Sequence, residues 1–343
     1  MGDAFNHAAL LTRLFAPFLF VRGLLIAVGL TMLLSGCGVS FGGPGVPPGV
    51  ATHTFVMPDG TRLPYRAWLP AGPPTAVVLA LHGMNDSRDA WEYPAATFTA
   101  AGIALFSPDQ RGFGATSTRG YWAGGQTMAS DARVMVRLLR ARYPHAKLIL
   151  MGESMGAAVL MLLATDPDPP HVDGYVLIAP AVWSRAEMNV FMRATLWIAN
   201  ETVPGLRLSG GELIRVTASD NREALHRLST DPLTLHATRI DAINGLVNLM
   251  DAASVAAARF HAPALFLYGG HDELIPPAAT TAVWRALPAG PVCAFYPAGY
   301  HLLLRDLRRV SPTEDIIAWI KRPHTPLPSG ADRAAAAWLA KQP

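Results

Sequence analysis

From residue 54 onward, short apolar runs alternate with longer segments in which apolar residues recur every three or four positions. The short runs indicate buried strands and the longer pattern indicates amphipathic helices. This alternation is typical of a mostly parallel sheet with helices on both faces. Eight strands are predicted, at residues 53–56, 63–69, 76–81, 103–107, 147–151, 175–179, 264–268 and 292–296. Helices are expected at residues 88–101, 128–143, 155–165, 278–286 and 313–321.

The interval between the sixth and seventh predicted strands breaks this alternation. Helical spacing recurs there at residues 185–200 and 241–259, with a loop at 204–211. An insertion of this length is typical of a cap subdomain, here about residues 181–260. The large apolar side chains of the insertion either pack it onto the sheet or line an acyl pocket. They are Trp183, Phe191, Met192, Trp197, Ile198, Leu246, Leu249 and Met250.

The first 36 residues are predicted to be a signal peptide outside the fold. Arg13 and Arg22 precede an apolar stretch at 23–34, which is too short to span a bilayer comfortably. The sequence ending in Cys37 resembles the lipobox of bacterial lipoproteins, in which the cysteine is lipidated and begins the mature chain. An uncleaved anchor is the alternative, and both interpretations place the domain outside the cytoplasmic membrane. Gly38 after the cysteine implies, by that resemblance, the periplasmic side of a Gram-negative outer membrane.

The rest of the chain divides into three predicted parts. Residues 37–52, rich in glycine and proline, are expected to form a flexible tether. The folded domain is predicted at 53–322, and the tail at 323–343 is either a short helix or disordered. Only two cysteines occur, so a lipidated Cys37 leaves no disulfide to form, and Cys293 is expected to be a buried, inert thiol.

Composition restricts the class of partner. Of the 343 residues 51% are hydrophobic and 15% are charged, so a large core is easily built. The formal net charge is +3 and no run of lysines and arginines occurs, which argues against a nucleic-acid partner. The sequence predicts no oligomeric state.

The segment Gly152-Glu153-Ser154-Met155-Gly156 joins a predicted strand to a predicted helix. Strand, G-x-S-x-G and helix together form a nucleophile elbow, in which a sharp turn projects the serine hydroxyl from the end of a strand. The pentapeptide alone is weak evidence. The hypothesis that Ser154 is a nucleophile therefore depends on partners in the chain order serine, acid, histidine.

Both partners occur in that order. A serine needs a general base, and the base needs a carboxylate that fixes its tautomer. Asp272 follows the strand at 264–268, where open sheets place their sites, and we predict it as the acid, with Glu273 as the nearest rival. His301 follows the last strand and is the predicted base. Three further loop histidines are expected to be solvated surface residues: His261, His271 and His324.

The oxyanion of an acyl-transfer reaction requires pre-aimed backbone donors. The amide of Met155, at the start of a helix, and the amide of Met84, beside Gly83, are the predicted donors. His82 precedes the nucleophile and is expected to hold this loop rather than act as base. The glycine-rich loop at 109–114 is interpreted as architecture.

These motifs resemble the α/β-hydrolase superfamily over about residues 54–321, and more closely its monoacylglycerol lipase and lysophospholipase group, which shares a sequence family with serine aminopeptidases. The departures from that group are Glu153, where histidine is common, and Ala157, where glycine is common. The matching segments are His82-Gly83-Met84, residues 109–114, 152–156 and 231–233, His271-Asp272 and Tyr300-His301.

The resemblance implies ester hydrolysis through an acyl-enzyme, with no metal or cofactor. Single-chain lipid esters are the expected substrates, and a lipid anchor would hold the enzyme at a membrane. Three alternatives stay open: a prolyl-type aminopeptidase, a non-lipid carboxylesterase or thioesterase, and a binding lipoprotein without activity. The aminopeptidase would need acidic cap residues to hold a substrate amine; the candidates are Glu187, Glu201, Glu212 and Glu223.

Overall fold

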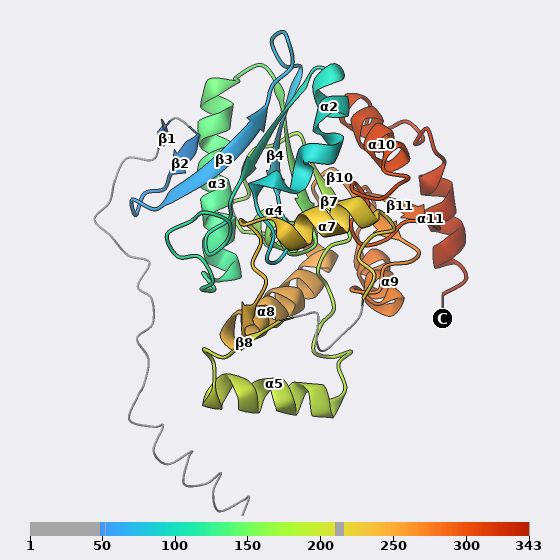
Figure 1. The fold of residues 1–343 in the computed structure, drawn as a ribbon. Helices are drawn as coiled ribbons and strands as arrows, with labels where there is room; N and C mark the ends of the chain where they lie inside the picture. The colour runs from blue at the N-terminus through green and yellow to red at the C-terminus, as the bar shows by residue number, and fades with distance from the viewer. Residues whose placement is uncertain (1–48, 52, 210–215, 343) are drawn as a thin grey trace, which may run out of the picture.

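The computed structural model describes residues 49–51, 53–209 and 216–342. Their centre is a sheet with the strand order β1-β2-β3-β5-β4-β6-β7-β10-β11 (Figure 1). The pairings from β1 to β5 are antiparallel and those from β5 to β11 are parallel. The strands are β1 (Gly49–Ala51), β2 (Thr54–Val56), β3 (Arg62–Trp68), β4 (Ala76–Leu81), β5 (Ile103–Pro108), β6 (Lys147–Glu153), β7 (Gly174–Ile178), β10 (Ala264–Gly269) and β11 (Val292–Tyr296).

All eight predicted strands are present, which confirms the α/β-hydrolase sheet. The additional strand, β1, lies in the segment predicted as a tether and pairs Gly49 with Val56 of β2. A short edge strand of this kind is held by backbone hydrogen bonds, so its sequence shows no alternating pattern of side chains from which it could be predicted. The sheet therefore begins before residue 53.

Helices cover both faces of the sheet, as predicted. Alternate residues of β4 point to opposite sides: Val78 joins a core with α2 and α10, and Leu79 joins a core with α3 and α4. Both faces of a central parallel strand are thus buried, which explains its unbroken apolar sequence. The helices of the body are η1 (Arg88–Trp91), α2 (Glu92–Ala100), α3 (Gly125–Arg142), α4 (Met155–Ala164), α9 (Pro277–Ala286) and α10 (Val310–Lys321).

The cap is inserted between β7 and β10, which confirms its predicted place after the sixth strand. Helix α8 packs against α4 of the body, and α5 packs on α8 and lies farthest from the sheet (Figure 1). Helices α5 and α8 correspond to the two predicted ones, whereas α7 and the small β8–β9 pair were not predicted. The described elements of the cap are α5 (Val190–Thr202), β8 (Arg207–Leu208), α7 (Arg222–Thr230), β9 (Thr238–Arg239) and α8 (Ile240–Ala256).

The C-terminal tail contains a helix, α11 (Ala331–Leu339), which packs on β11. The Trp338 ring stacks on Phe295 with centroids 4.8 Å apart. The folded unit therefore extends past residue 322, where the sequence placed its end. Cys293 of β11 is half-buried, and burial raises the pKa of its thiol to about 12, in agreement with an inert thiol.

The predicted signal peptide and Cys37 lie outside the described residues. Within the described part of the chain, no helix has the length and apolar character needed to cross a bilayer.

Candidate active site

Ser154 occupies a sharp turn between β6 and α4, at φ 53° and ψ −115°. A residue other than glycine in such a conformation costs about 1–3 kcal/mol, so the surroundings must hold it. The Ser154 amide donates to the Ile178 carbonyl (2.9 Å), and the Ser154 carbonyl accepts from the Ala181 amide (3.0 Å). The serine side chain does not cap α4, although Ser154 occupies the capping position. The Ser154 hydroxyl is therefore used neither to cap the helix nor to hold the turn.

The glycines of the elbow are needed for close packing rather than for positive φ. A Cβ at Gly156 would lie 2.3 Å from the Leu81 carbonyl oxygen, and one at Gly152 would lie 2.6 Å from the Ala157 nitrogen. Only glycine lets α4 approach β4 and β6 this closely. A Cβ at Gly83 would lie 3.4 Å from the Ser154 Cβ, so the loop after β4 passes directly beside the candidate nucleophile.

The structure brings the predicted acid and base together. His301 Nδ1 lies 2.8 Å from Asp272 Oδ2, and both side chains are buried. The other oxygen, Asp272 Oδ1, accepts from the amides of Leu274 and Ile275, both at 2.9 Å. Because an ionised carboxylate only accepts, Nδ1 carries the proton and Nε2 is left as the basic nitrogen. Burial lowers the pKa of His301, but the charge and hydrogen bond of Asp272 outweigh it, so the net shift is upward.

The rivals for these roles are placed elsewhere. Glu273 Oε2 accepts from the Thr217 amide at 2.6 Å, so the side chain of Glu273 turns to the cap and not to His301. The three histidines expected at the surface are exposed, as predicted: His261, His271 and His324.

The loop after β4 is held by a buried histidine. His82 Nδ1 donates to the Gly83 carbonyl (2.8 Å), and Nε2 accepts from the Gln110 amide (3.0 Å). Burial lowers the pKa of His82, which keeps the ring neutral and suited to donate on one side and accept on the other. This confirms the structural role predicted for His82. The oxyanion donors, the amides of Met84 and Met155, directly follow Gly83 and Ser154, and their role stays a prediction.

The loop at 109–114 is architectural, as predicted. Asp109 accepts from the amides of Arg88 (2.7 Å) and Ala115 (2.8 Å). Arg111 forms ion pairs with Asp131 (2.8 Å) and Asp59 (2.6 Å). These bonds fix the loop to η1, α3 and the β2–β3 turn.

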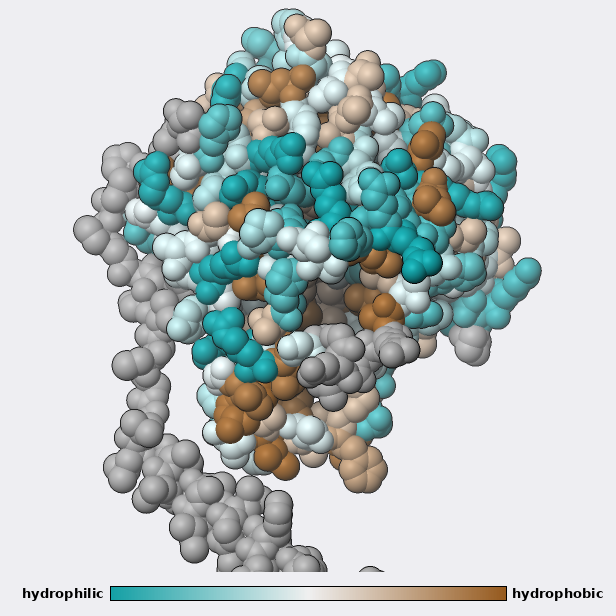
Figure 2. Space-filling model, in the orientation of Figure 1, coloured by the Kyte–Doolittle hydropathy of each residue, from teal (hydrophilic) through white to brown (hydrophobic). Residues whose placement is uncertain are grey.

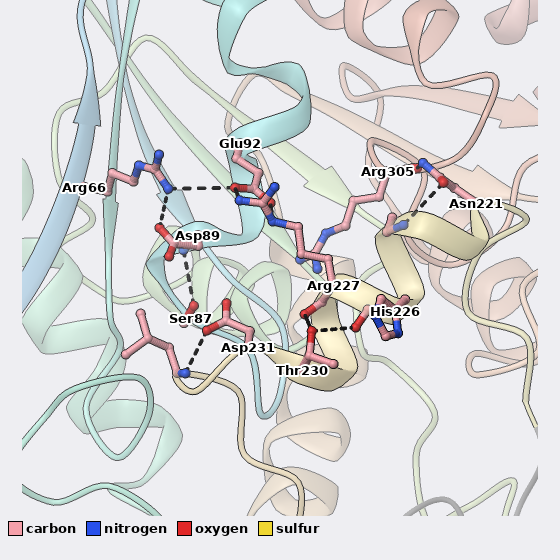
Figure 3. Close-up of polar contacts among 12 residues, drawn as sticks. Arg66, Ser87, Asp89, Glu92, Asn221, His226, Arg227, Thr230, Asp231 and Arg305 are labelled. Atoms are coloured by element: carbon pink, nitrogen blue, oxygen red, sulfur yellow. Dashed lines mark hydrogen bonds and ion pairs between the residues drawn. The ribbon is translucent and has the colours of Figure 1, made fainter.

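Sequence reasoning missed the part of the cap that binds the catalytic loops. Residues 217–221 of the cap form hydrogen bonds with the loops that carry Asp272 and His301. Helix α7 begins directly after this segment. Arg227 Nε of α7 lies 2.5 Å from Glu92 Oε1 of α2. Figure 3 shows these two side chains facing each other. Asn221 both caps α7 and donates to the Arg305 carbonyl (2.8 Å). The further bonds of this segment are Thr217 amide to Glu273, Leu302 amide to Ala218 carbonyl (2.9 Å) and Ser219 Oγ to Asp306 (2.6 Å).

A buried ion cluster was also missed. Arg305 Nη2 pairs with Asp86 Oδ2 and lies 3.4 Å from Glu153 Oε2, and all three side chains are nearly inaccessible. The only sequence signal was Glu153, a departure from the common histidine at that position. Asp86 and Arg305 belong to no motif.

Three of the four acidic cap residues that an aminopeptidase would need are exposed: Glu187, Glu201 and Glu223. Glu212 lies outside the described residues.

The chain matches a known protein family: a family model described as serine aminopeptidase, S33, matches residues 72–308. The chain is 25% identical to a monoacylglycerol lipase of Mycolicibacterium smegmatis over 78% of this chain and 96% of the relative. It is 26% identical to the monoglyceride lipase of Rattus norvegicus over 78% and 89% of the two chains.

Solved structures share the fold. A monoacylglycerol lipase of Paleococcus ferrophilus superposes with a TM-score of 0.62 at 22% identity, covering 75% of this chain and 98% of the other. A Saccharomyces cerevisiae monoglyceride lipase bound to a substrate analogue gives 0.67 at 18% identity, covering 80% and 97%.

Proposed function

We propose, from the premise that the chain belongs to the serine aminopeptidase S33 family, that it is a serine hydrolase which cleaves carboxylic esters of single-chain lipids. The observation that carries this proposal is the Asp272–His301 pair, at 2.8 Å, in the loops that follow β10 and β11. Ser154 stands at the end of β6, so all three groups extend from the same edge of a parallel sheet. The similarity to lipases of several organisms favours an ester over a peptide bond.

The reaction proceeds in two halves. Ser154 Oγ attacks the ester carbonyl while His301 Nε2 takes the hydroxyl proton, and Asp272 stabilises the imidazolium that forms. The amides of Met84 and Met155 hold the oxyanion. The tetrahedral intermediate collapses, the carbon–oxygen bond to the alcohol breaks, and His301 returns the proton to the leaving alkoxide. Water, deprotonated by His301, then attacks the acyl-enzyme and releases the fatty acid and free Ser154.

The surface of the cap supports a lipid substrate. Helix α5 has no buried residue, and Phe191 and Trp197 are 80% and 66% exposed. Figure 2 shows apolar residues gathered over α5 at the lower end of the molecule. Exposed apolar patches of this kind commonly mark surfaces that meet lipid or another protein. We assign monoacylglycerols, lysophospholipids or similar esters as the substrate class.

A comparison of lipid classes tests the substrate. We expect monooleoylglycerol and lysophosphatidylcholine, presented in identical detergent micelles, to be hydrolysed at least about tenfold faster than trioleoylglycerol, a factor equivalent to 1.4 kcal/mol in the barrier. The assay measures released oleate. Equal or faster release from trioleoylglycerol contradicts a single-chain preference.

The proposed location is the periplasmic side of an outer membrane, with Cys37 carrying the lipid. Radiolabelled palmitate fed to expressing cells should enter the wild-type protein, and Cys37→Ala should lose the label because its thiol is the acceptor. Cys293→Ala is the matched control and should keep the label. Equal labelling of the wild type and Cys37→Ala contradicts the proposed anchor.

A further inference from the structure

The guanidinium of Arg305 joins the three segments on which the proposed reaction depends. Arg305 lies four residues after His301, pairs with Asp86 in the loop that carries Met84, and reaches Glu153, the residue before Ser154. Figure 3 shows its side chain extending between α2 and α7. One buried cation, Arg305, thus links three segments: the loop that carries His301 (the base loop), the loop after β4 and the nucleophile elbow.

The cluster holds more negative than positive charge. Two carboxylates, Asp86 and Glu153, share one guanidinium, and the closer bond goes to Asp86. Burial, together with the negative charges of Asp86 and Asp306, raises the pKa of Glu153 to about 7, although the charges of Arg305 and His301 act to lower it. Glu153 is therefore a carboxylate that changes charge near neutral pH.

His82 is a further titratable group beside Glu153, because it follows Leu81, the β4 residue that pairs with Gly152, and burial lowers the pKa of its ring. The flanking elements β4 and α4 carry none. In β7 the only titratable residue is Tyr175, which pairs with Leu150, three residues before Glu153 in β6. The groups that face Glu153 are thus His82 and those of the cluster and of the loop that carries His301: Arg305, His301, Asp86 and Asp306.

The electrostatic coupling between Glu153 and His301 also acts on His301. Burial lowers the pKa of the His301 imidazole, Asp272 raises it, and Glu153 raises it as a second negative charge, with Arg305 opposing. A carboxylate near an imidazole favours the protonated ring, which is the form that His301 takes in the transition state. Asp272 accounts for the larger effect, and Glu153 adds to it from the elbow itself.

We propose that Glu153 is a positioning residue, oriented by Arg305, whose negative charge stabilises the imidazolium of His301 during catalysis. This inference rests on the proposed hydrolase mechanism, although it concerns only the base and holds for any acyl substrate. The residue acts through His301 and does not touch the substrate. It also gives the departure from histidine at this position a chemical role.

Glu153→Gln tests the proposal, because glutamine keeps the shape and removes the charge. The measurement is the pH profile of the second-order rate of Ser154 labelling by a fluorophosphonate, which requires no knowledge of the natural substrate. We expect the acidic limb to move to lower pH by about one unit, and the plateau to fall about tenfold, since one unit of pKa corresponds to a factor of ten. Glu153→Asp, which keeps the charge, should restore most of both.

The matched control is Asp131→Asn, which removes a buried carboxylate from its ion pair with Arg111, in the architectural loop. It should lower thermal stability and leave the acidic limb where the wild type has it. A Glu153→Gln limb that coincides with the wild-type limb overturns the proposal, whatever the change in plateau, because a merely structural glutamate would lower the rate without shifting the limb.

A second measurement, made on the wild-type protein, tests the proposal if Glu153→Gln does not fold. In the wild type, with histidines labelled with ¹³C at Cε1, the His301 resonance should titrate with two inflections, one of them from Glu153. The signal is assigned by its loss in His301→Gln. A single inflection overturns the proposal. Probe labelling without ester hydrolysis would instead contradict the proposed function and leave this test of Glu153 intact.

Discussion

Ser154→Ala is expected to lower kcat for ester hydrolysis by on the order of 10⁵-fold, because the acyl-enzyme route is lost with the nucleophile. The melting temperature should stay close to that of the wild type. The serine side chain does not cap α4, and the bonds that hold the turn run through the backbone, to Ile178 and Ala181. Released fatty acid and fluorophosphonate labelling measure the loss, and circular dichroism measures the melting.

Ser229→Ala is the matched control. Its hydroxyl bonds to the His226 carbonyl at the exposed end of α7, far along the chain from the elbow. Activity and labelling of this variant should equal those of the wild type. If Ser154→Ala keeps more than a small fraction of the activity while folded, another residue is the nucleophile and the proposed site is wrong.

Asp272→Asn is expected to lower kcat by about 10⁴-fold with little change in the binding of substrate. Asp272 Oδ1 accepts two amide protons, from Leu274 and Ile275. An asparagine keeps its oxygen on those donors and turns its NH₂ group toward His301 Nδ1. That nitrogen must then accept, so the ring proton moves to Nε2 and the base is lost. Steady-state kcat and KM measure the effect.

Glu273→Gln provides the control for Asp272→Asn. Glu273 is adjacent to Asp272 in the sequence, but its carboxylate accepts a hydrogen bond from the Thr217 amide of the cap. The control should change kcat by less than about fivefold, since the net contribution of a typical single hydrogen bond is about 1 kcal/mol. Equal losses in the two variants would mean that the Asp272–His301 pair is not the acid and base of the reaction.

The body of the fold was predictable because its elements are buried in a regular way. Each parallel strand is covered on both faces and reads as an apolar run, as in β4 and β6. Helix α7 was missed because it buries only Ala224. The Asn221 cap and the Arg227–Glu92 ion pair hold it in place, and the latter joins residues that are far apart in the chain. Strand β1 and the β8–β9 pair are too short to produce a pattern.

The candidate site was predictable where its residues belong to a local motif. Ser154 is recognised from its glycines, and Asp272 and His301 from their place after strands. The Asp86–Arg305–Glu153 cluster could not be found in this way. Its members come from three distant segments that only the folded sheet brings together. The same holds for the bonds between the cap at 217–221 and the catalytic loops.

The central claim is that Ser154 attacks a lipid ester and not a peptide bond. The most direct test compares kcat/KM of the wild type for an acyl-chain series of monoacylglycerols with kcat/KM for prolyl and other aminoacyl amides, with Ser154→Ala as the blank. We predict hydrolysis of the esters, abolished in Ser154→Ala, with amide hydrolysis at least about a thousandfold slower, a difference of roughly 4 kcal/mol in the barrier. Turnover of the amides alone would contradict the account.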